Sequence, residues 1–293
     1  MVLKTREIAR SLTPTERLDD EFYYGYRTII SHDDEGRTIY SYQPLSLEDF
    51  LNPQEGDLFM QGTLHDEDTD ALKSIFRYLY RDEPATAVFS DLKILWGIQG
   101  LAQPAPDIMV VPGVSDPAKP RQVFDVTLEG VQPRFILEVI SPRYRQPDRD
   151  KKVALYEQAG IEEYFILDSW LEGERVAYEV LGYRLAGDIY TQIQPNEQGW
   201  IFSQVTQVWL GVDQQRQHFF VIDGRTGERI LPAEARAEAE AARAKAEAEA
   251  RRQAEIRAEA ETEARRQAET RLVAMEARLR ELEAQYQQRQ GKH

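Results

Sequence analysis

Two acidic residues lie at or inside strongly apolar stretches of this chain of 293 residues. Asp107 directly precedes Ile108-Met109-Val110-Val111, and Glu138 lies within Phe135–Ile140. Apolar residues on both sides predict strands that are covered on both faces, where a carboxylate loses its hydration and needs a partner. Two such acids on neighbouring strands can share one divalent cation that prefers oxygen ligands. The pattern therefore favours a metal site.

An alternative interpretation needs no metal. Asp107 would begin its strand at the solvent edge, and Glu138 would pair with an arginine such as Arg134 or Arg149, because buried acids are usually paired. Three features favour the metal site instead. Pro106 fixes the chain just before Asp107, Glu138 lies within its apolar run, and a dense group of basic residues follows (Arg143, Arg145, Arg149, Lys151 and Lys152).

The basic group leads into a helix that we expect to continue from Val153 to Tyr156, and a strand from Glu163 to Asp168 closes the unit. A lysine of this helix could lie beside the metal. The basic group also has a simpler interpretation, a solvated helix start with ion pairs to Asp148 and Asp150.

The motifs of this stretch resemble those of the PD-(D/E)XK nuclease superfamily, through Pro106-Asp107 and Glu138-Val139-Ile140. Within the superfamily, the chain is similar to a bacterial family of putative restriction endonucleases. The similarity covers about residues 44 to 225 and continues through these residues: Ser141, Asp148-Arg149, Lys152, Tyr156, Gly160, Glu163-Tyr164 and Asp168.

The resemblance implies a fold and an activity. The fold would be α/β, with a mixed central sheet flanked by helices as in restriction endonucleases, followed by a long C-terminal helix or coiled coil. The activity would be hydrolysis of phosphodiester bonds in DNA, with Mg²⁺ as cofactor or Mn²⁺ in its place.

The resemblance also implies roles for single residues. Asp107, Glu138 and the Val139 carbonyl would hold the metal, and Lys152 would orient a water molecule and stabilise negative charge. Contacts to the phosphate would come from three further residues: Ser141, Arg143 and Arg149.

One position departs from the superfamily pattern. Ile140 stands where the superfamily has its catalytic lysine, two residues after the strand glutamate. Lys152 on the following helix is our candidate replacement, and Lys151 fits less well. If no lysine reaches the site, the chain would be a catalytically inactive nuclease-fold binding or scaffold protein that associates through its C-terminal helix. A metal-dependent hydrolase of a smaller phosphate substrate is a third hypothesis.

The first long helix is expected at residues 66 to 81, because Leu72, Ile75, Phe76 and Leu79 recur at helical spacing. An acid on the first helix often faces the metal in the superfamily, and Glu67 is the candidate, with His65 as a neighbour that could contact water or phosphate. The alternative is that Glu67 only complements the helix N-terminus.

The composition excludes several classes of protein. The chain has no cysteine and four histidines, so a disulfide framework, a thiol nucleophile and a histidine-rich metal site are not expected. The chain has no apolar run of about 18 residues, so no membrane span is expected. We expect a cytoplasmic protein. The formal net charge of −15 disfavours general attraction to nucleic acid, so a local basic cluster would have to supply it.

We divide the chain into an N-terminal extension (1–43) with a short hairpin, an endonuclease-like domain (44–228) and a helical tail (229–293). After Asp168, four further apolar segments are expected to extend the sheet. The tail is rich in Ala, Glu and Arg, and its apolar residues near the end follow a heptad pattern: Leu272, Met275, Leu279, Leu282 and Tyr286. That pattern favours a homodimer, while a monomeric charge-stabilised helix is the alternative.

Overall fold

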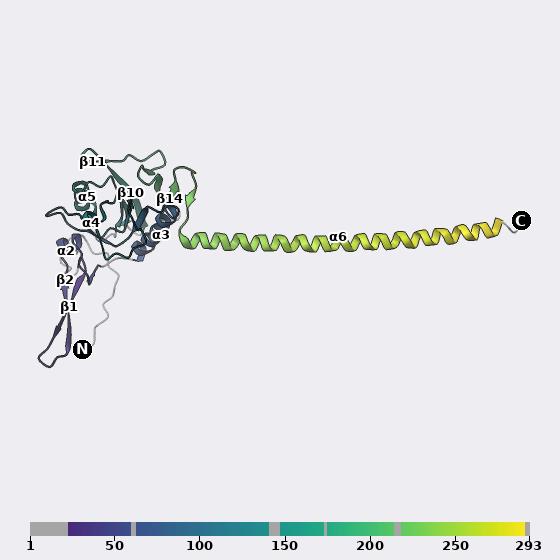
Figure 1. The fold of residues 1–293 in the computed structure, drawn as a ribbon, viewed down its shortest axis with the longest axis horizontal. Helices are drawn as coiled ribbons and strands as arrows, with labels where there is room; N and C mark the ends of the chain where they lie inside the picture. The colour runs from purple at the N-terminus through teal and green to yellow at the C-terminus, as the bar shows by residue number, and fades with distance from the viewer. Residues whose placement is uncertain (1–22, 60–62, 141–146, 173–174, 214–217, 291–293) are drawn as a thin grey trace. The chain divides into compact units, whose positions relative to one another are not determined.

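The computed structural model describes residues 23–59, 63–140, 147–172, 175–213 and 218–290. The chain divides into two compact units, Met1–Ala233 and Glu234–His293. Figure 1 shows the described elements of the first unit, which hold all the candidate site residues that are described.

The centre of the first unit is a mixed sheet of six strands in the order β11-β10-β9-β8-β6-β4. Strands β8 and β9 run parallel and the other neighbouring pairs run antiparallel, which confirms the predicted mixed sheet. The bounds of the strands are β4 (Thr86–Phe89), β6 (Ile108–Pro112), β8 (Phe135–Ile140), β9 (Glu163–Glu172), β10 (Arg175–Ala186) and β11 (Ile189–Gln192).

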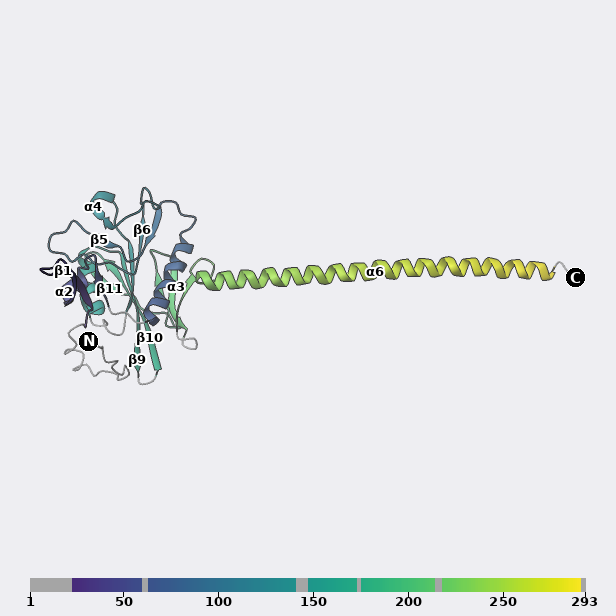
Figure 2. The same ribbon diagram turned by 90° about the horizontal axis from the view of Figure 1, so that it is seen from below.

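Both faces of this sheet are covered, as the apolar runs predicted. Along β8, Phe135, Leu137 and Val139 face one core, which includes helix α3 (Thr63–Leu79). Ile136 and Ile140 face the other core, which includes helix α5 (Val153–Gln158). Figures 1 and 2 show α3 and the central strands side by side, and Figure 1 places α5 across the sheet from α3. Because side chains alternate along a strand, Glu138 points to the α5 side.

A second sheet of four strands covers the α3 side of the first: β12 (Ile201–Ser203), β13 (Val208–Asp213), β14 (His218–Asp223) and β15 (Arg229–Ile230). The prediction that all strands after Asp168 extend the central sheet is therefore wrong, and only β10 and β11 extend it. The physical reason is that Val208, Leu210 and Val221 bury their side chains in the core on the α3 side. Alternation predicts such a buried face but not the sheet to which a strand belongs.

The remaining elements lie around this core. The predicted hairpin is confirmed as β1 (Tyr26–His32) and β2 (Thr38–Pro44), and the short β3 (Asp57–Leu58) pairs with β1. Helix α2 (Leu47–Leu51) begins with a reciprocal pair of hydrogen bonds between Ser46 and Asp49, which caps its N-terminus. Strands β5 (Lys93–Leu95) and β7 (Val123–Asp125) form a small parallel pair, followed by α4 (Val126–Glu129).

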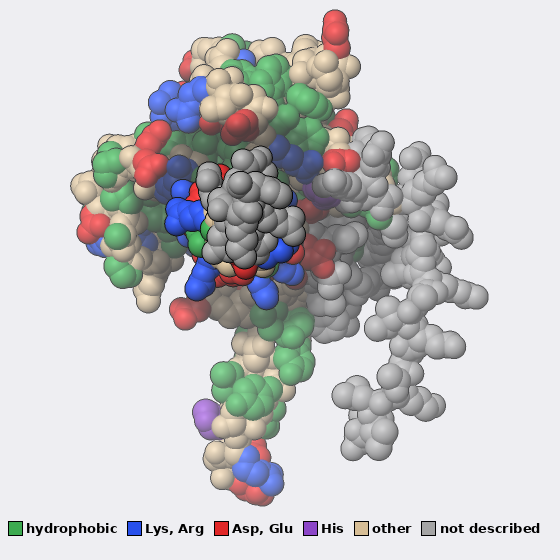
Figure 3. Space-filling model, turned by 90° about the vertical axis from the view of Figure 1, so that its right-hand side faces the viewer, with side chains coloured by type: hydrophobic (Ala, Val, Ile, Leu, Met, Phe, Trp, Pro, Cys, Tyr) green, Lys and Arg blue, Asp and Glu red, His purple; other side chains and the backbone are tan. Residues whose placement is uncertain are grey.

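The hairpin exposes large apolar side chains. Ile30, Tyr40 and Tyr42 are each more than half exposed, and Figure 3 shows hydrophobic side chains along this projecting arm.

The described part of the second unit lies in helix α6 (Ala233–Gln290), which confirms the predicted long C-terminal helix. Leu272, Met275, Leu279 and Leu282 are between 50% and 71% exposed on it. Tyr286, the last residue of the predicted heptad pattern, lies outside the side chains that the structure describes. None of the helices in the described part of the chain is long and apolar enough to cross a membrane.

Candidate active site

The two predicted acids lie beside each other, since Glu138 is in β8 and Asp107 directly precedes the neighbouring β6. Ile108 of β6 pairs with Leu137 of β8, so Asp107 and Glu138 occupy the next step of this antiparallel ladder. Both are buried, at 5% and 3% exposure. The Val139 backbone N–H donates a hydrogen bond of 2.7 Å to Asp107 Oδ2. The backbone of the glutamate strand thus fixes the aspartate.

The environment of Asp107 opposes its ionisation. Burial raises the pKa of the Asp107 carboxyl well above its usual value, and the nearby Glu138 charge raises it further, while Lys152 opposes both effects. Such a site favours either a proton or a cation between the two acids, because a buried carboxylate needs compensating positive charge.

Lys152 reaches this pair from the next helix. It is 6% exposed, and its Nζ lies 3.0 Å from Glu138 Oε1. The Tyr156 hydroxyl donates a hydrogen bond of 2.8 Å to the same oxygen. Lys152 ends a π-helical segment, η1 (Pro147–Lys152), that leads directly into α5. Segments of π-helix are rare and are often found at functional sites.

The predicted arginine partners of Glu138 are engaged elsewhere. Arg134 forms an ion pair with Glu162. Arg149 donates to Asp168 Oδ2 at 3.0 Å and to Glu179 Oε2 at 2.6 Å. Asp168 is fully buried on β9, and Glu179 is its partner across the ladder on β10. Arg149 therefore ties η1 to two strands of the central sheet.

The other phosphate contacts inferred from the resemblance, Ser141 and Arg143, lie outside the described residues. Glu67 is on α3 but its side chain is exposed, and it does not line the pocket beside Asp107. The structure does not bring Glu67 together with the other candidates.

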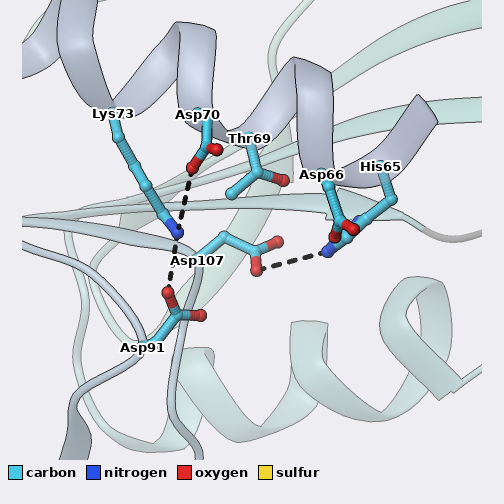
Figure 4. Close-up of a pocket in the computed structure, with 7 residues that line it drawn as sticks. All are labelled: His65, Asp66, Thr69, Asp70, Lys73, Asp91 and Asp107. Atoms are coloured by element: carbon cyan, nitrogen blue, oxygen red, sulfur yellow. Dashed lines mark hydrogen bonds and ion pairs between the residues drawn. The ribbon is translucent and has the colours of Figure 1, made fainter. Parts of the chain in front are cut away.

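His65 lies where an acid of the first helix was expected. It is 6% exposed, and its Nε2 lies 3.8 Å from Asp107 Oδ1 (Figure 4). Burial lowers the pKa of the His65 imidazole, so the ring is neutral near pH 7. His65 and Thr69 continue the buried stripe of Leu72 and Phe76 at helical spacing, and this phase was the sequence signal that separates His65 from Glu67.

The residues present fit a hard divalent cation. Asp107, Glu138 and the Val139 carbonyl provide oxygen donors, which Mg²⁺ and Mn²⁺ prefer. Burial and the nearby Glu138 charge raise the pKa of Asp107 in spite of Lys152, so a further positive charge beside Asp107 would favour its ionised form. Among the described residues, no group of three or more His, Asp or Glu side chains could hold a metal ion. The inferred set needs only two side chains together with a backbone carbonyl.

Both a family model and solved structures match this chain. A family model described as putative restriction endonuclease matches residues 51–214. A solved structure of a putative nuclease belonging to DUF820, from Anabaena variabilis ATCC 29413, matches at 15% identity with a TM-score of 0.35. The match covers 67% of this chain and 90% of that one. No curated protein matches.

Proposed function

This chain belongs to the Uma2 family of putative restriction endonucleases, and we propose that it is an endonuclease that cleaves DNA by metal-dependent hydrolysis. The family membership confirms the resemblance found in the sequence and supports a nuclease function. DNA as the substrate and Mg²⁺ as the cofactor are the finer part of the proposal. We also propose residues 44–228 as the nuclease domain, a range that contains the matched residues.

The observation that carries the proposal is the arrangement of Asp107, Glu138 and Lys152. Two buried acids lie side by side, one in β8 and one directly before β6, and a buried ammonium group lies 3.0 Å from Glu138. Asp107, Glu138 and the Val139 carbonyl would hold Mg²⁺, or Mn²⁺ in its place. When bound, the ion would polarise the phosphoryl oxygen and lower the pKa of a bound water.

The side chains around the proposed metal would position the attacking water and the two carboxylates. The Lys152 ammonium would stabilise negative charge that develops on the phosphate and orient the attacking water. Tyr156 holds Glu138, and the Val139 N–H holds Asp107, so neither carboxylate needs to reorganise. Glu67 has no part in the proposal, because its side chain is exposed.

Ser141 and Arg143 are proposed contacts to the scissile phosphate. Arg149 has a different proposed role, because two carboxylates already engage its guanidinium. It would position η1, and with it Lys152.

We propose DNA as the partner despite the net charge of −15. Acidic and basic side chains are interspersed on the face visible in Figure 3. A bound divalent ion and the basic segment from Arg143 to Lys152 would supply the local attraction to phosphate. Several phosphate contacts would make the affinity for DNA fall steeply with salt, whereas a small phosphate substrate would show little salt dependence.

The test is cleavage of supercoiled plasmid and short single strands with Mg²⁺ or Mn²⁺. We expect Asp107→Asn and Lys152→Gln each to lower the rate by about 100-fold or more. Lys151→Gln is the matched control, since Lys151 is adjacent but exposed, and it should keep its activity. Equal rates in all variants would indicate a contaminating nuclease. The scaffold hypothesis would replace the proposal if the wild-type chain neither cleaves DNA nor binds Mn²⁺ in calorimetry.

A further inference from the structure

The strands of the β1–β2 hairpin are uncharged over most of their length. Residues 28–32 and 38–43 contain no Asp, Glu, Lys or Arg, although these four types make up 30% of the chain. Charged side chains gather at the tip of the hairpin (Figure 3), where Arg37 pairs with Asp33 at 2.7 Å. The strands thus present a neutral surface on a chain with a formal net charge of −15.

Strand β2 is the outer edge of its sheet. The sheet has the order β2-β1-β3, so among the described strands β2 has a neighbour only on its β1 side. An edge strand presents a row of backbone N–H and C=O groups that have no strand to bond. Within the described part of the chain, no group outside the hairpin bonds the backbone of residues 38–43. The edge therefore offers a place for another strand.

Two other edge strands of the molecule are covered by side chains. In β11, the edge of the central sheet, the Tyr190 N–H donates a hydrogen bond to the Glu157 carboxylate. In β12, the edge of the second sheet, the Phe202 carbonyl accepts a hydrogen bond of 3.1 Å from Arg184. Natural sheets commonly cover or shorten their edges, which prevents pairing with further strands. Strand β2 is longer than both, with seven residues against four and three, and its outer edge has no such cover from the described residues.

One face of the hairpin exposes large apolar side chains. Ile30 lies opposite Tyr40, and both share a face with Tyr42, two residues further along β2. The three residues are 61%, 62% and 58% exposed. An isolated two-stranded hairpin is marginally stable in water, whereas three or more strands with an apolar face are stable. Pairing along β2 would therefore stabilise the hairpin and give Tyr40 and Tyr42 new neighbours.

A second copy of the chain fits this edge. Identical strands can pair antiparallel across a two-fold axis, which closes a dimer because both copies use the same surface. With the axis at Ser41, Tyr40 of each copy lies opposite Tyr42 of the other, on one face of the sheet. Cross-strand aromatic pairs stabilise antiparallel strands, and like charges directly opposite each other destabilise them. The uncharged strands meet both conditions, so two acidic chains can approach each other here.

Nucleic acid and charged proteins fit the edge less well. Attraction to phosphate requires Lys or Arg, and residues 28–32 and 38–43 contain neither. A basic protein partner would be selected by carboxylates, which these strands also lack. The charge pattern therefore favours the self-complementary occupant.

We propose that β2 is a homodimer interface, in which the edge strands of two copies pair antiparallel about Ser41 into a sheet of the order β1-β2-β2-β1. The contact is separate from the exposed apolar residues of α6 and does not depend on cleavage of DNA. The hairpin precedes residues 51–214, which match the family model, so the interface is an addition to the nuclease core.

The test measures association of the full chain by sedimentation velocity and by hydrogen–deuterium exchange. All samples carry Leu279→Glu, which places a charge among the exposed apolar residues of α6 and so removes association through that helix. We expect a monomer–dimer equilibrium with a dissociation constant on the order of 100 μM, because the paired strand is short. The outward backbone amides of residues 38–43 should exchange several-fold more slowly at about 500 μM than at about 5 μM, because pairing protects them.

Charges placed at the axis identify the contact. Ser41→Lys brings two like charges together, so the dissociation constant should rise at least about 5-fold. Ser31→Lys is the matched control, because it adds the same charge to an exposed serine of β1, away from the outer edge of β2. It should change the dissociation constant by less than about twofold, since salt screens the more distant charges. Both serines are exposed, so both variants should melt with the parent chain at low concentration.

A mixing experiment tests the two-fold axis itself. An equimolar mixture of the Ser41→Lys and Ser41→Glu chains should associate at least as tightly as the parent, although each variant alone associates weakly. The reason is that opposite charges then meet across the axis. A mixture that does not associate would overturn the antiparallel pairing about Ser41, and so would equal weakening by Ser31→Lys and Ser41→Lys.

Hydrogen exchange separates the other occupants of the edge. Protection of residues 38–43 that does not change with concentration would assign the edge to a strand of the same chain and overturn the proposal. A monomer at about 500 μM with unprotected amides would also overturn it, and would leave the edge to a strand of a different protein. Association with the expected variant pattern in a chain that does not cleave DNA would support the interface and reject only the proposed function.

Discussion

Tyr156 and Lys152 both contact the same oxygen of Glu138, Oε1. Removing one oxygen atom from Tyr156 would delete its contact and leave that of Lys152 in place. Tyr156→Phe removes the hydroxyl that donates to Glu138 Oε1 at 2.8 Å. We expect a loss of about 1 kcal/mol of stability, as for a typical buried hydrogen bond. We also expect a several-fold lower rate of DNA cleavage, because the carboxylate loses one of its two anchors.

Tyr190→Phe is the control for this prediction. The Tyr190 hydroxyl of the wild type donates a hydrogen bond of 2.8 Å to the Ile161 carbonyl, and neither Asp107 nor Glu138 takes part in it. The substitution should cost similar stability in thermal unfolding and leave the cleavage rate unchanged. Equal effects of the two substitutions on cleavage would show that Tyr156 acts only through stability.

Asp68 gives a pH-dependent prediction about stability. Burial raises the pKa of its carboxyl to about 6, and the neighbouring Glu67 charge contributes. A raised pKa means that the folded state binds the proton more tightly than the unfolded state, so the ionised carboxylate destabilises the fold above pH 6. This penalty disappears as the pH falls toward the ordinary value of 3.8.

Asp68→Asn removes the penalty. The variant should therefore melt at a higher temperature than the wild type at pH 8. The gain in free energy of unfolding should be no more than about 2 kcal/mol, because solvent screens the partly exposed carboxylate. At pH 4 the two should melt together. Thermal unfolding at both pH values measures the difference, and Asp82→Asn on the exposed turn after α3 serves as control. A constant difference at both pH values would contradict the assignment.

Residues of the site were predictable from the sequence where the reason was local. Burial of Glu138 followed from its apolar neighbours, whereas the choice of Lys152 came from the resemblance to the nuclease family. The choice of Glu67 did not use the rotational phase of α3. The apolar stripe that begins at Leu72, when it is extended back by two turns, passes through His65 and not through Glu67. The engagement of Arg149 by Asp168 and Glu179 joins three segments far apart in the chain, and no local pattern indicates it.

At the scale of elements, η1 is the segment on which the site depends most. It presents Arg149 to the sheet and Lys152 to Glu138, and it follows residues 141–146, which lie outside the described part. Two ion pairs, to Asp168 at 3.0 Å and to Glu179 at 2.6 Å, fix it to β9 and β10. The position of Lys152 therefore depends on a contact made on a different pair of strands.

Arg149→Gln tests whether this contact positions Lys152 or binds phosphate. If it positions the lysine, kcat should fall about 10-fold with KM and its salt dependence unchanged. A phosphate contact would instead raise KM and reduce the salt dependence of DNA binding by about one charge. Steady-state kinetics on a short duplex at two salt concentrations distinguish the two. Arg134→Gln, which breaks an exposed ion pair with Glu162, is the control.

The elements themselves were predictable to different degrees. Strands β6, β8 and β9, the β1–β2 hairpin and the cap of α2 follow from short-range alternation and turn residues. Two features did not follow: the separation of β12 to β15 into a second sheet, and the parallel pairing of β5 with β7. Both depend on pairing between distant segments, which alternation within a strand does not specify.

At the scale of the whole molecule, the apolar seam of α6 predicts self-association. Leu272, Met275, Leu279 and Leu282 are at least half exposed and follow spacings of three and four residues. Such a seam buries its leucines when two helices pack as a coiled coil. The seam is only about two heptads long, so we propose a weak homodimer, with dissociation in the micromolar range or above.

Leu279→Glu should abolish this dimer, because a carboxylate in the seam would be buried without a partner in both helices. We expect the apparent dissociation constant from sedimentation velocity of the full chain to rise at least about 10-fold, which corresponds to roughly 1.4 kcal/mol. Val273→Glu is the matched control, since Val273 is 65% exposed on the same stretch of helix but lies off the heptad positions. A wild-type chain that stays monomeric at 100 μM would remove the dimer from the proposal, and α6 would then be a charge-stabilised single helix. Equal weakening by the two substitutions would instead assign the association to general hydrophobic contact along α6, because the heptad phase would no longer decide which side chains are buried.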